Sequence, residues 1–184
     1  TERAWAVERS DPDAAFARRL RIDLTDIPPL IAVPHLPGNV VPVDEVRGKK
    51  VDQVYIGNCS NGTMTDLRQT AEILAGRRVH PDCRAIVVPA TQRIYREAMR
   101  EGLLDAFVEA GAIVSTPTCG ACFGGHMGVL GPGESAITTT NRNFRGRMGS
   151  SEAEVHLANA WVAAAAAVSG EIVDPADVLE GVPA

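Results

Sequence analysis

Residues 51–88 read VDQVYIGNCSNGTMTDLRQTAEILAGRRVHPDCRAIVV, and this stretch decides the fold. Val51–Ile56 is a largely apolar run typical of a strand, and a glycine follows it. Asp66–Leu74 has apolar residues at helical spacing and a glycine stop at Gly76. Ala85–Val88 is a short, continuous apolar run, which is typical of a buried parallel strand. Strand, helix and strand in this order predict a parallel α/β unit.

The same alternation continues toward the C-terminus. Helical spacing recurs over Gln92–Arg100 and Leu103–Glu109, and Ala112–Ser115 is the next expected strand. A further strand is expected at Ala136–Thr140, and a final helix over residues 152–168, which include the alanine-rich run AWVAAAAAV. The predicted fold class is therefore α/β, a three-layer domain with a mainly parallel sheet.

Residues 1–48 differ in composition from the rest of the chain, because they are rich in proline. Within them, Arg19–Asp26 alternates apolar and polar residues, which predicts a strand. Ile27–Asp44 is interrupted by prolines and is expected to be extended. We therefore expect a lead-in arm or interdomain segment over residues 1–48 and an α/β domain over residues 49–184.

Composition excludes several functional classes. Hydrophobic residues make up 45% of the 184 residues, enough for a sizeable core, whereas the net charge of −5 and 4% aromatic content argue against a general nucleic-acid binder. The longest apolar run is too short to span a bilayer, and the N-terminus is charged throughout. We expect a cytoplasmic protein, in which cysteines are more often ligands or catalytic thiols than disulfides. Structural disulfides remain an alternative.

The cysteines occupy particular places in this pattern. Cys59 follows the first predicted strand, and Cys119 and Cys122 follow the third. Because sites in open parallel sheets form beyond the carboxyl ends of the strands, these three thiols are expected to meet at one edge. Cys83 precedes the second strand and should lie at the opposite edge, as a half-buried structural residue. Cys83 and His126 are possible fourth ligands of a metal, although a histidine in a loop is more often a hydrogen-bonding partner.

Three cysteines leave several chemistries open. A Cys-x-x-Cys pair serves in redox motifs, zinc sites and iron–sulfur sites. Gly124 and Gly125 argue against a helix that begins at Cys122, which makes a redox motif less favourable. A structural zinc site needs four protein ligands. A metal centre with three protein ligands keeps an open position that can bind a substrate oxygen, and on a cubane cluster one iron would be open.

A basic segment follows the expected strand at Ala136–Thr140. Residues 141–147 read NRNFRGR. Because guanidinium groups bind carboxylates with two parallel hydrogen bonds, Arg142 and Arg147 are candidates to bind a substrate carboxylate. A solvated basic turn is the alternative interpretation of the same residues.

Taken in order, these motifs resemble one known family. GNCSNG at residues 57–62, TCGAC at 118–122 followed by GGHMG at 124–128, and NRNFRGR at 141–147 resemble the aconitase superfamily. The closest likeness is to the large subunit of 3-isopropylmalate dehydratases, over its C-terminal, cluster-binding part. The resemblance covers most of the chain and is strongest over residues 51–156.

This resemblance implies a function and a ligand set. It implies a 4Fe-4S cluster bound by Cys59, Cys119 and Cys122, with Asn61 supporting the cluster loop. The implied activity is that of a hydro-lyase, which interconverts 2-isopropylmalate and 3-isopropylmalate by dehydration and rehydration in leucine biosynthesis. The resemblance also implies that Asn141, Arg142 and Arg147 bind the substrate.

The chain departs from the family pattern in its length. Family large subunits are much longer, and the N-terminal large-subunit domains have no counterpart here. The catalytic base is expected on a small subunit or swivelling domain, so the chain should be inactive by itself. Alternatives are a homoaconitase-, aconitase- or methylmalate-type dehydratase, a non-catalytic zinc or cluster-sensing module, and an RNA-binding regulator.

Overall fold

The computed structural model describes residues 6–180 and contains a seven-stranded mixed sheet in the order β2-β1-β7-β6-β3-β4-β5. Strands β3 to β7 pair in parallel, whereas β1 pairs antiparallel with both β7 and β2. The α/β class with a mainly parallel sheet is thus confirmed. The strands are β1 (Leu30–Ala32), β2 (Val40–Pro42), β3 (Gln53–Gly57), β4 (Arg84–Val88), β5 (Ile113–Val114), β6 (Ser135–Thr138) and β7 (Glu154–Leu157).

Helices α2 and α3 each follow a threonine that caps them. Thr63 precedes α2 and forms a capping box with Asp66, and Thr91 accepts a hydrogen bond from the first turn of α3. No helix among residues 6–180 is long and apolar enough to cross a bilayer. The helices are α1 (Asn58–Asn61), α2 (Met64–Leu74), α3 (Gln92–Arg100), α4 (Leu103–Glu109), α5 (Ala160–Ser169) and α6 (Pro175–Glu180), with the 3-10 helices η1 (Val43–Val46) and η2 (Gly120–Phe123).

The two faces of the sheet are covered differently. Helices α2 and α5 pack on β3 and on each other, and Val54 and Ile56 belong to the core on this helix side. The side chain between them, Tyr55, packs on the other face with Cys122 and Met148. The loops that carry these residues therefore form the third layer. Because side chains alternate along a strand, β3 contributes to both cores at once.

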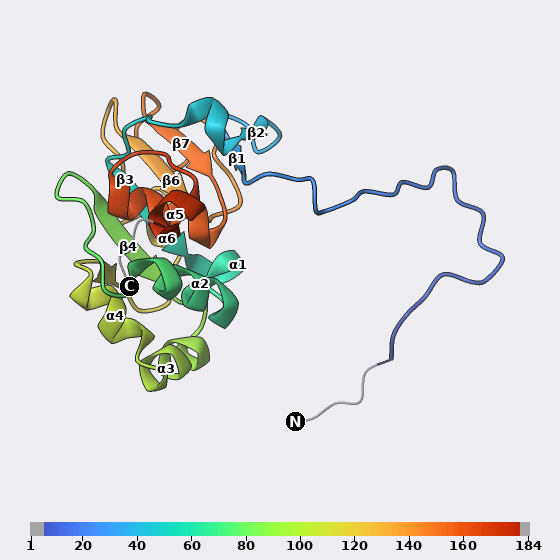
Figure 1. Cartoon of the computed structure of the whole chain (residues 1–184), viewed down its shortest axis with the longest axis horizontal. Helices are drawn as coiled ribbons and strands as arrows, with labels where there is room; N and C mark the ends of the chain where they lie inside the picture. Colours follow the sequence, from blue (N-terminus) through green and yellow to red (C-terminus); the bar gives the residue numbers. More distant parts are fainter. Residues whose placement is uncertain (1–5, 181–184) are drawn as a thin grey trace.

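The prediction of a strand at Arg19–Asp26 is wrong. These residues have no regular secondary structure, and Leu20, Ile22 and Leu24 are exposed. The segment runs as an extended arm away from the sheet (Figure 1). A strand forms only where another strand pairs with it, and no strand within residues 6–180 pairs with this arm.

The end of the segment 1–48 joins the sheet. Strands β1 and β2, both within the expected arm, form one edge of the sheet in Figure 1. Pro42 lies on the edge strand β2, where a missing N–H costs no ladder hydrogen bond. The arm outside the sheet is therefore shorter than residues 1–48.

The expected helix over residues 152–168 is wrong in its first part. Glu154–Leu157 forms strand β7, which lies between β6 and β1, and α5 starts only at Ala160. Asn159 sets the start of α5, because its Oδ1 accepts a hydrogen bond of 2.9 Å from the backbone N–H of Val162 and so caps the helix. The strand was missed because the alanine-rich run that follows it has helical propensity, and the expected helix was extended back over it.

The buried side chain of His156 makes the stability of the fold dependent on pH. His156 is fully buried in β7, its Nδ1 lies 3.3 Å from the carbonyl of Ala136, and its Nε2 has no partner among the described residues. Burial, with a smaller contribution from the charge of Lys49, lowers the pKa of His156 to about 4. The unfolded chain binds this proton near pH 6.5 and the folded chain only near pH 4, so acid favours unfolding. We expect the free energy of unfolding to fall between pH 6.5 and 4, by up to about 3 kcal/mol.

Urea titrations at several pH values in this window measure the effect. His156→Phe keeps a ring of similar size without a titrating group, so its free energy of unfolding should change much less between pH 6.5 and 4.5. Parallel pH profiles for the two chains would show that other groups are responsible.

Candidate metal centre

Cys59 lies in the single-turn helix α1 at the carboxyl end of β3, and we call residues 57–62 the Cys59 loop. Gly57 and Asn58 both have positive φ angles, 107° and 82°, which turn the chain sharply out of the sheet. Thr139, just after β6, holds this loop at two points. Its Oγ1 accepts a hydrogen bond of 2.7 Å from the N–H of Gly57, and its carbonyl accepts one from the side chain of Asn61. The adjacent strand thus fixes the loop that exposes Cys59.

Cys119 and Cys122 lie in the turn that follows β5. The N–H of Cys122 donates to the carbonyl of Cys119 at 3.1 Å, and the turn continues as η2. Gly124 ends η2 in a left-handed conformation, and no α-helix begins at Cys122. Cys122 is buried against the sheet, whereas Cys119 is exposed.

The pKa of Cys119 depends on its burial and on its cysteine neighbours. Burial raises the pKa of the Cys119 thiol, and the neighbouring charges of Cys122 and Cys59 and a hydrogen bond with Cys122 raise it further. The thiolate form of Cys119 is therefore disfavoured in the protein by itself. A bound cation would reverse this preference, because it stabilises thiolates.

The thiols do not form a site for a single ion. Within residues 6–180, no group of three or more His, Cys, Asp or Glu side chains is arranged to hold one metal ion. A zinc ion would need four ligands that converge on one point. In a cubane cluster each cysteine binds a different iron, so the sulfur atoms need not converge. The donor set fits a cluster better than a single ion.

Two residues of the basic segment lie against the cysteine loops. Arg147 donates from Nε to the carbonyl of Cys122 at 2.7 Å, and its Nη2 lies 3.9 Å from the Cys122 sulfur. Asn141 donates from its side chain to the hydroxyl of Ser60, the residue after Cys59, at 3.4 Å. The structure therefore brings Asn141 and Arg147 to the thiols, one against each loop.

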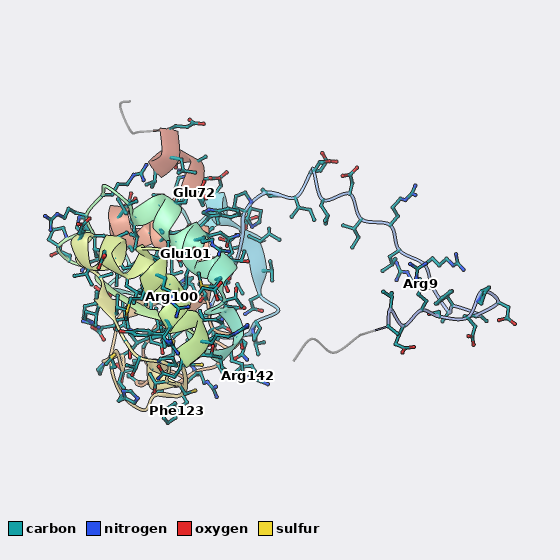
Figure 2. The ribbon with its side chains drawn as sticks, turned by 90° about the horizontal axis from the view of Figure 1, so that it is seen from below. Arg9, Glu72, Arg100, Glu101, Phe123 and Arg142 are labelled. Atoms are coloured by element: carbon teal, nitrogen blue, oxygen red, sulfur yellow. The ribbon has the colours of Figure 1, made fainter. Side chains whose placement is uncertain are left out.

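Arg142 is exposed at the same end of the domain. Its guanidinium group lies 5.9 Å from the centre of the Phe144 ring. Figure 2 shows Arg142 and Phe123, the last residue of η2, together at the end of the domain opposite α6. Arg142 is thus available to a ligand that approaches the cysteine loops from outside.

Cys83 and His126 have the places expected for them. Cys83 lies just before β4, at the opposite edge of the sheet from Cys59, and burial raises its pKa to about 11. The Nε2 of His126 lies 3.0 Å from the hydroxyl of Thr118. Neither residue adds to the group of three thiols.

Sequence reasoning missed the residues that support this site. Asn143 is fully buried, and its amide donates to the carbonyls of Val33 and Val155 at 3.0 and 3.1 Å. It fastens the basic segment to β7 and to the residue after β1. Tyr55 and Thr139 also support the loops. In the sequence, the only sign of this role is that Asn143 is a polar residue within the basic segment to which no ligand-binding role was assigned.

Comparisons with known proteins agree with this picture. The profile of the aconitase family (aconitate hydratase) matches residues 44–170. The chain is 73% identical over 177 residues, or 96% of its length, to the 3-isopropylmalate dehydratase large subunit 2 of Rubrobacter xylanophilus. It is 55% identical over 178 residues to the 3-isopropylmalate dehydratase large subunit of Desulfitobacterium hafniense. It spans 42% of the length of each of these relatives.

Proposed function

Because the chain belongs to the aconitase family, we propose that it is the cluster-bearing part of a hydro-lyase of the 3-isopropylmalate dehydratase type. The observation that carries this proposal is the grouping of Cys59, Cys119 and Cys122 at the carboxyl edge of a parallel sheet. Three free thiols, of which Cys59 and Cys119 are exposed, suit a 4Fe-4S cluster with one open iron.

Each protein group has a definable task in this proposal. Cys59, Cys119 and Cys122 would hold the cluster, which when bound supplies a Lewis-acidic iron for a hydroxyl or carboxylate oxygen. Arg147 already directs Nε to the Cys122 carbonyl, and its remaining N–H donors can bind a substrate carboxylate. Exposed Arg142 can bind a second carboxylate, and Asn141 keeps the basic segment against the Cys59 loop.

The rest of the enzyme would come from other parts. The chain spans 42% of the length of its relatives, whose names describe them as large subunits. We therefore propose that the remaining large-subunit domains and a small subunit with the catalytic base complete the site. The part of residues 1–48 that precedes β1 would connect the cluster domain to the preceding domain. The substrates would be 2-isopropylmalate and 3-isopropylmalate, and free thiols suit the reducing cytoplasm.

Anaerobic reconstitution tests the proposal directly. The chain is incubated with ferrous iron and sulfide, or with zinc, and then desalted, and bound metal and acid-labile sulfide are measured. We expect iron and sulfide in similar amounts with a broad visible absorption, and no interconversion of the isopropylmalates until the missing parts are added. A colourless chain that retains zinc and no sulfide would exclude the dehydratase proposal, and turnover by the chain itself would exclude the proposed need for partners.

A further inference from the structure

The hydroxyl of Tyr55 lies beneath the thiols and links their loops. Tyr55 is fully buried in β3, and its hydroxyl donates to the carbonyl of Cys119 at 3.3 Å. Tyr55 packs in the same core as Cys122.

This contact connects two separate parts of the site. Tyr55 is in the strand that leads directly into the Cys59 loop, whereas the carbonyl that it contacts starts the turn of Cys119 and Cys122. That carbonyl also accepts the N–H of Cys122, so the phenol is its second donor. Tyr55 thus connects β3, which leads to Cys59, with the turn that contains Cys119 and Cys122.

Gly120 shows how closely the turn approaches the phenol. Gly120 has a φ of 49°, and a Cβ at this position would lie 2.7 Å from the Tyr55 hydroxyl. Such a separation is shorter than a carbon–oxygen contact allows. Because Gly120 has no side chain, the turn can lie in direct contact with the Tyr55 hydroxyl, and this contact determines the position of the turn.

We propose that Tyr55 is a positioning residue of the cluster site, whose hydroxyl sets the Cys119–Cys122 turn at a fixed distance from the Cys59 loop. The inference rests on the proposed cluster for its functional meaning. The contact between the phenol and the turn involves protein groups alone, so it can be tested separately.

The variant Tyr55→Phe removes the hydroxyl and keeps the ring. Tyr95→Phe is the matched control, because Tyr95 of α3 packs against the helix-side core. Alkylation by iodoacetamide of the metal-free chain, followed by peptide mass mapping, gives a rate for each cysteine. We expect Tyr55→Phe to raise the rates at Cys119 and Cys122 about fivefold, which corresponds to about 1 kcal/mol, with Cys59 and Cys83 unchanged.

Reconstitution provides a second measurement that a merely structural role would not change. We expect the Tyr55→Phe chain to bind iron and sulfide but to show an altered electron paramagnetic resonance spectrum after reduction and faster loss of iron to a chelator. The Tyr95→Phe chain should match the unaltered chain in both measurements.

The outcomes separate this inference from the proposed function. Equal increases in alkylation at all four cysteines, buried Cys83 included, would assign the hydroxyl to general stability and overturn the inference. Unchanged alkylation and an unchanged spectrum in Tyr55→Phe would do the same. If the unaltered chain takes up no iron and sulfide, the proposed function fails, and the alkylation rates still decide whether Tyr55 positions the turn.

Discussion

Replacement of Cys119 by alanine is expected to reduce the iron and sulfide bound after anaerobic reconstitution by at least about tenfold. The chain brings three thiols to the site, and a cubane with two protein ligands would leave two irons to solvent. Cluster binding also has to offset the burial and the neighbouring cysteines that raise the pKa of Cys119, because a ligating thiol must be deprotonated. Losses of more than tenfold are expected because changes to residues that only orient a ligand already cost 10–100-fold in metal affinity. Iron and acid-labile sulfide per chain, with the visible absorption, measure the result.

Cys83→Ala is the matched control for this loss. Cys83 is buried in the helix-side core before β4, so its removal should leave the cluster intact and cost about 1 kcal/mol of stability through a small cavity. Cys59→Ala and Cys122→Ala should behave like Cys119→Ala. Full iron and sulfide in any of these three variants, or their loss in Cys83→Ala, would show that the ligand set is wrong.

The sequence predicts the central part of the fold well, because its strands are buried on both faces. β3, β4 and β6 lie inside the sheet, and their apolar runs are short and bounded by glycine or polar residues. The helices over Gln92–Arg100 and Leu103–Glu109 have the expected bounds. The expected grouping of the thiols rests on the same reasoning, because parallel strands bring their carboxyl ends to one edge.

The errors arise where a local pattern depends on a partner far away in the sequence. Glu154–Leu157 is a strand because β6 and β1 pair with it, and its four residues carry too little pattern to show this. The alternation at Arg19–Asp26 lacks such a partner within residues 6–180 and forms no strand. A pattern of period two indicates which residues can pair, and tertiary structure decides whether they do.

The supporting residues of the site could not be predicted for the same reason. Thr139 and Asn143 act through hydrogen bonds to residues that are distant in the sequence. The bond from Gly57 to Thr139 spans 82 residues, and the bond from Asn143 to Val33 spans 110. In the sequence, Tyr55 cannot be distinguished from the other apolar residues of its strand. Only the structure shows the contact between its hydroxyl and the carbonyl of Cys119. Ligand types can be recognised from composition and spacing, whereas the groups that hold them are defined by the folded chain.

Replacement of Gly57 by alanine should destabilise the fold by at least about 4 kcal/mol, among the largest effects expected of a single substitution. A Cβ at Gly57 would lie 2.0 Å from the backbone oxygen of Val88 and 2.8 Å from its carbonyl carbon. Gly57 and Val88 are partners in the parallel pairing of β3 and β4, so neither backbone can move without disrupting the centre of the sheet. The φ of 107° adds strain for any residue with a side chain. Urea unfolding followed by circular dichroism measures the change.

Gly76→Ala distinguishes the steric effect from the backbone strain. Gly76 also has a positive φ, 73°, but a Cβ there would meet no heavy atom within 4 Å, so alanine should cost only about 1–2 kcal/mol. The difference between the two variants is then the cost of forcing β3 away from β4. Since Gly57 directly precedes the loop of Cys59, the same displacement should reduce iron and sulfide binding in any Gly57→Ala chain that still folds, whereas Gly76→Ala should bind the cluster fully. Equal destabilisation by the two substitutions would mean that the sheet yields at Val88, and that the Cys59 loop is held by Thr139 more than by the close approach of the two strands.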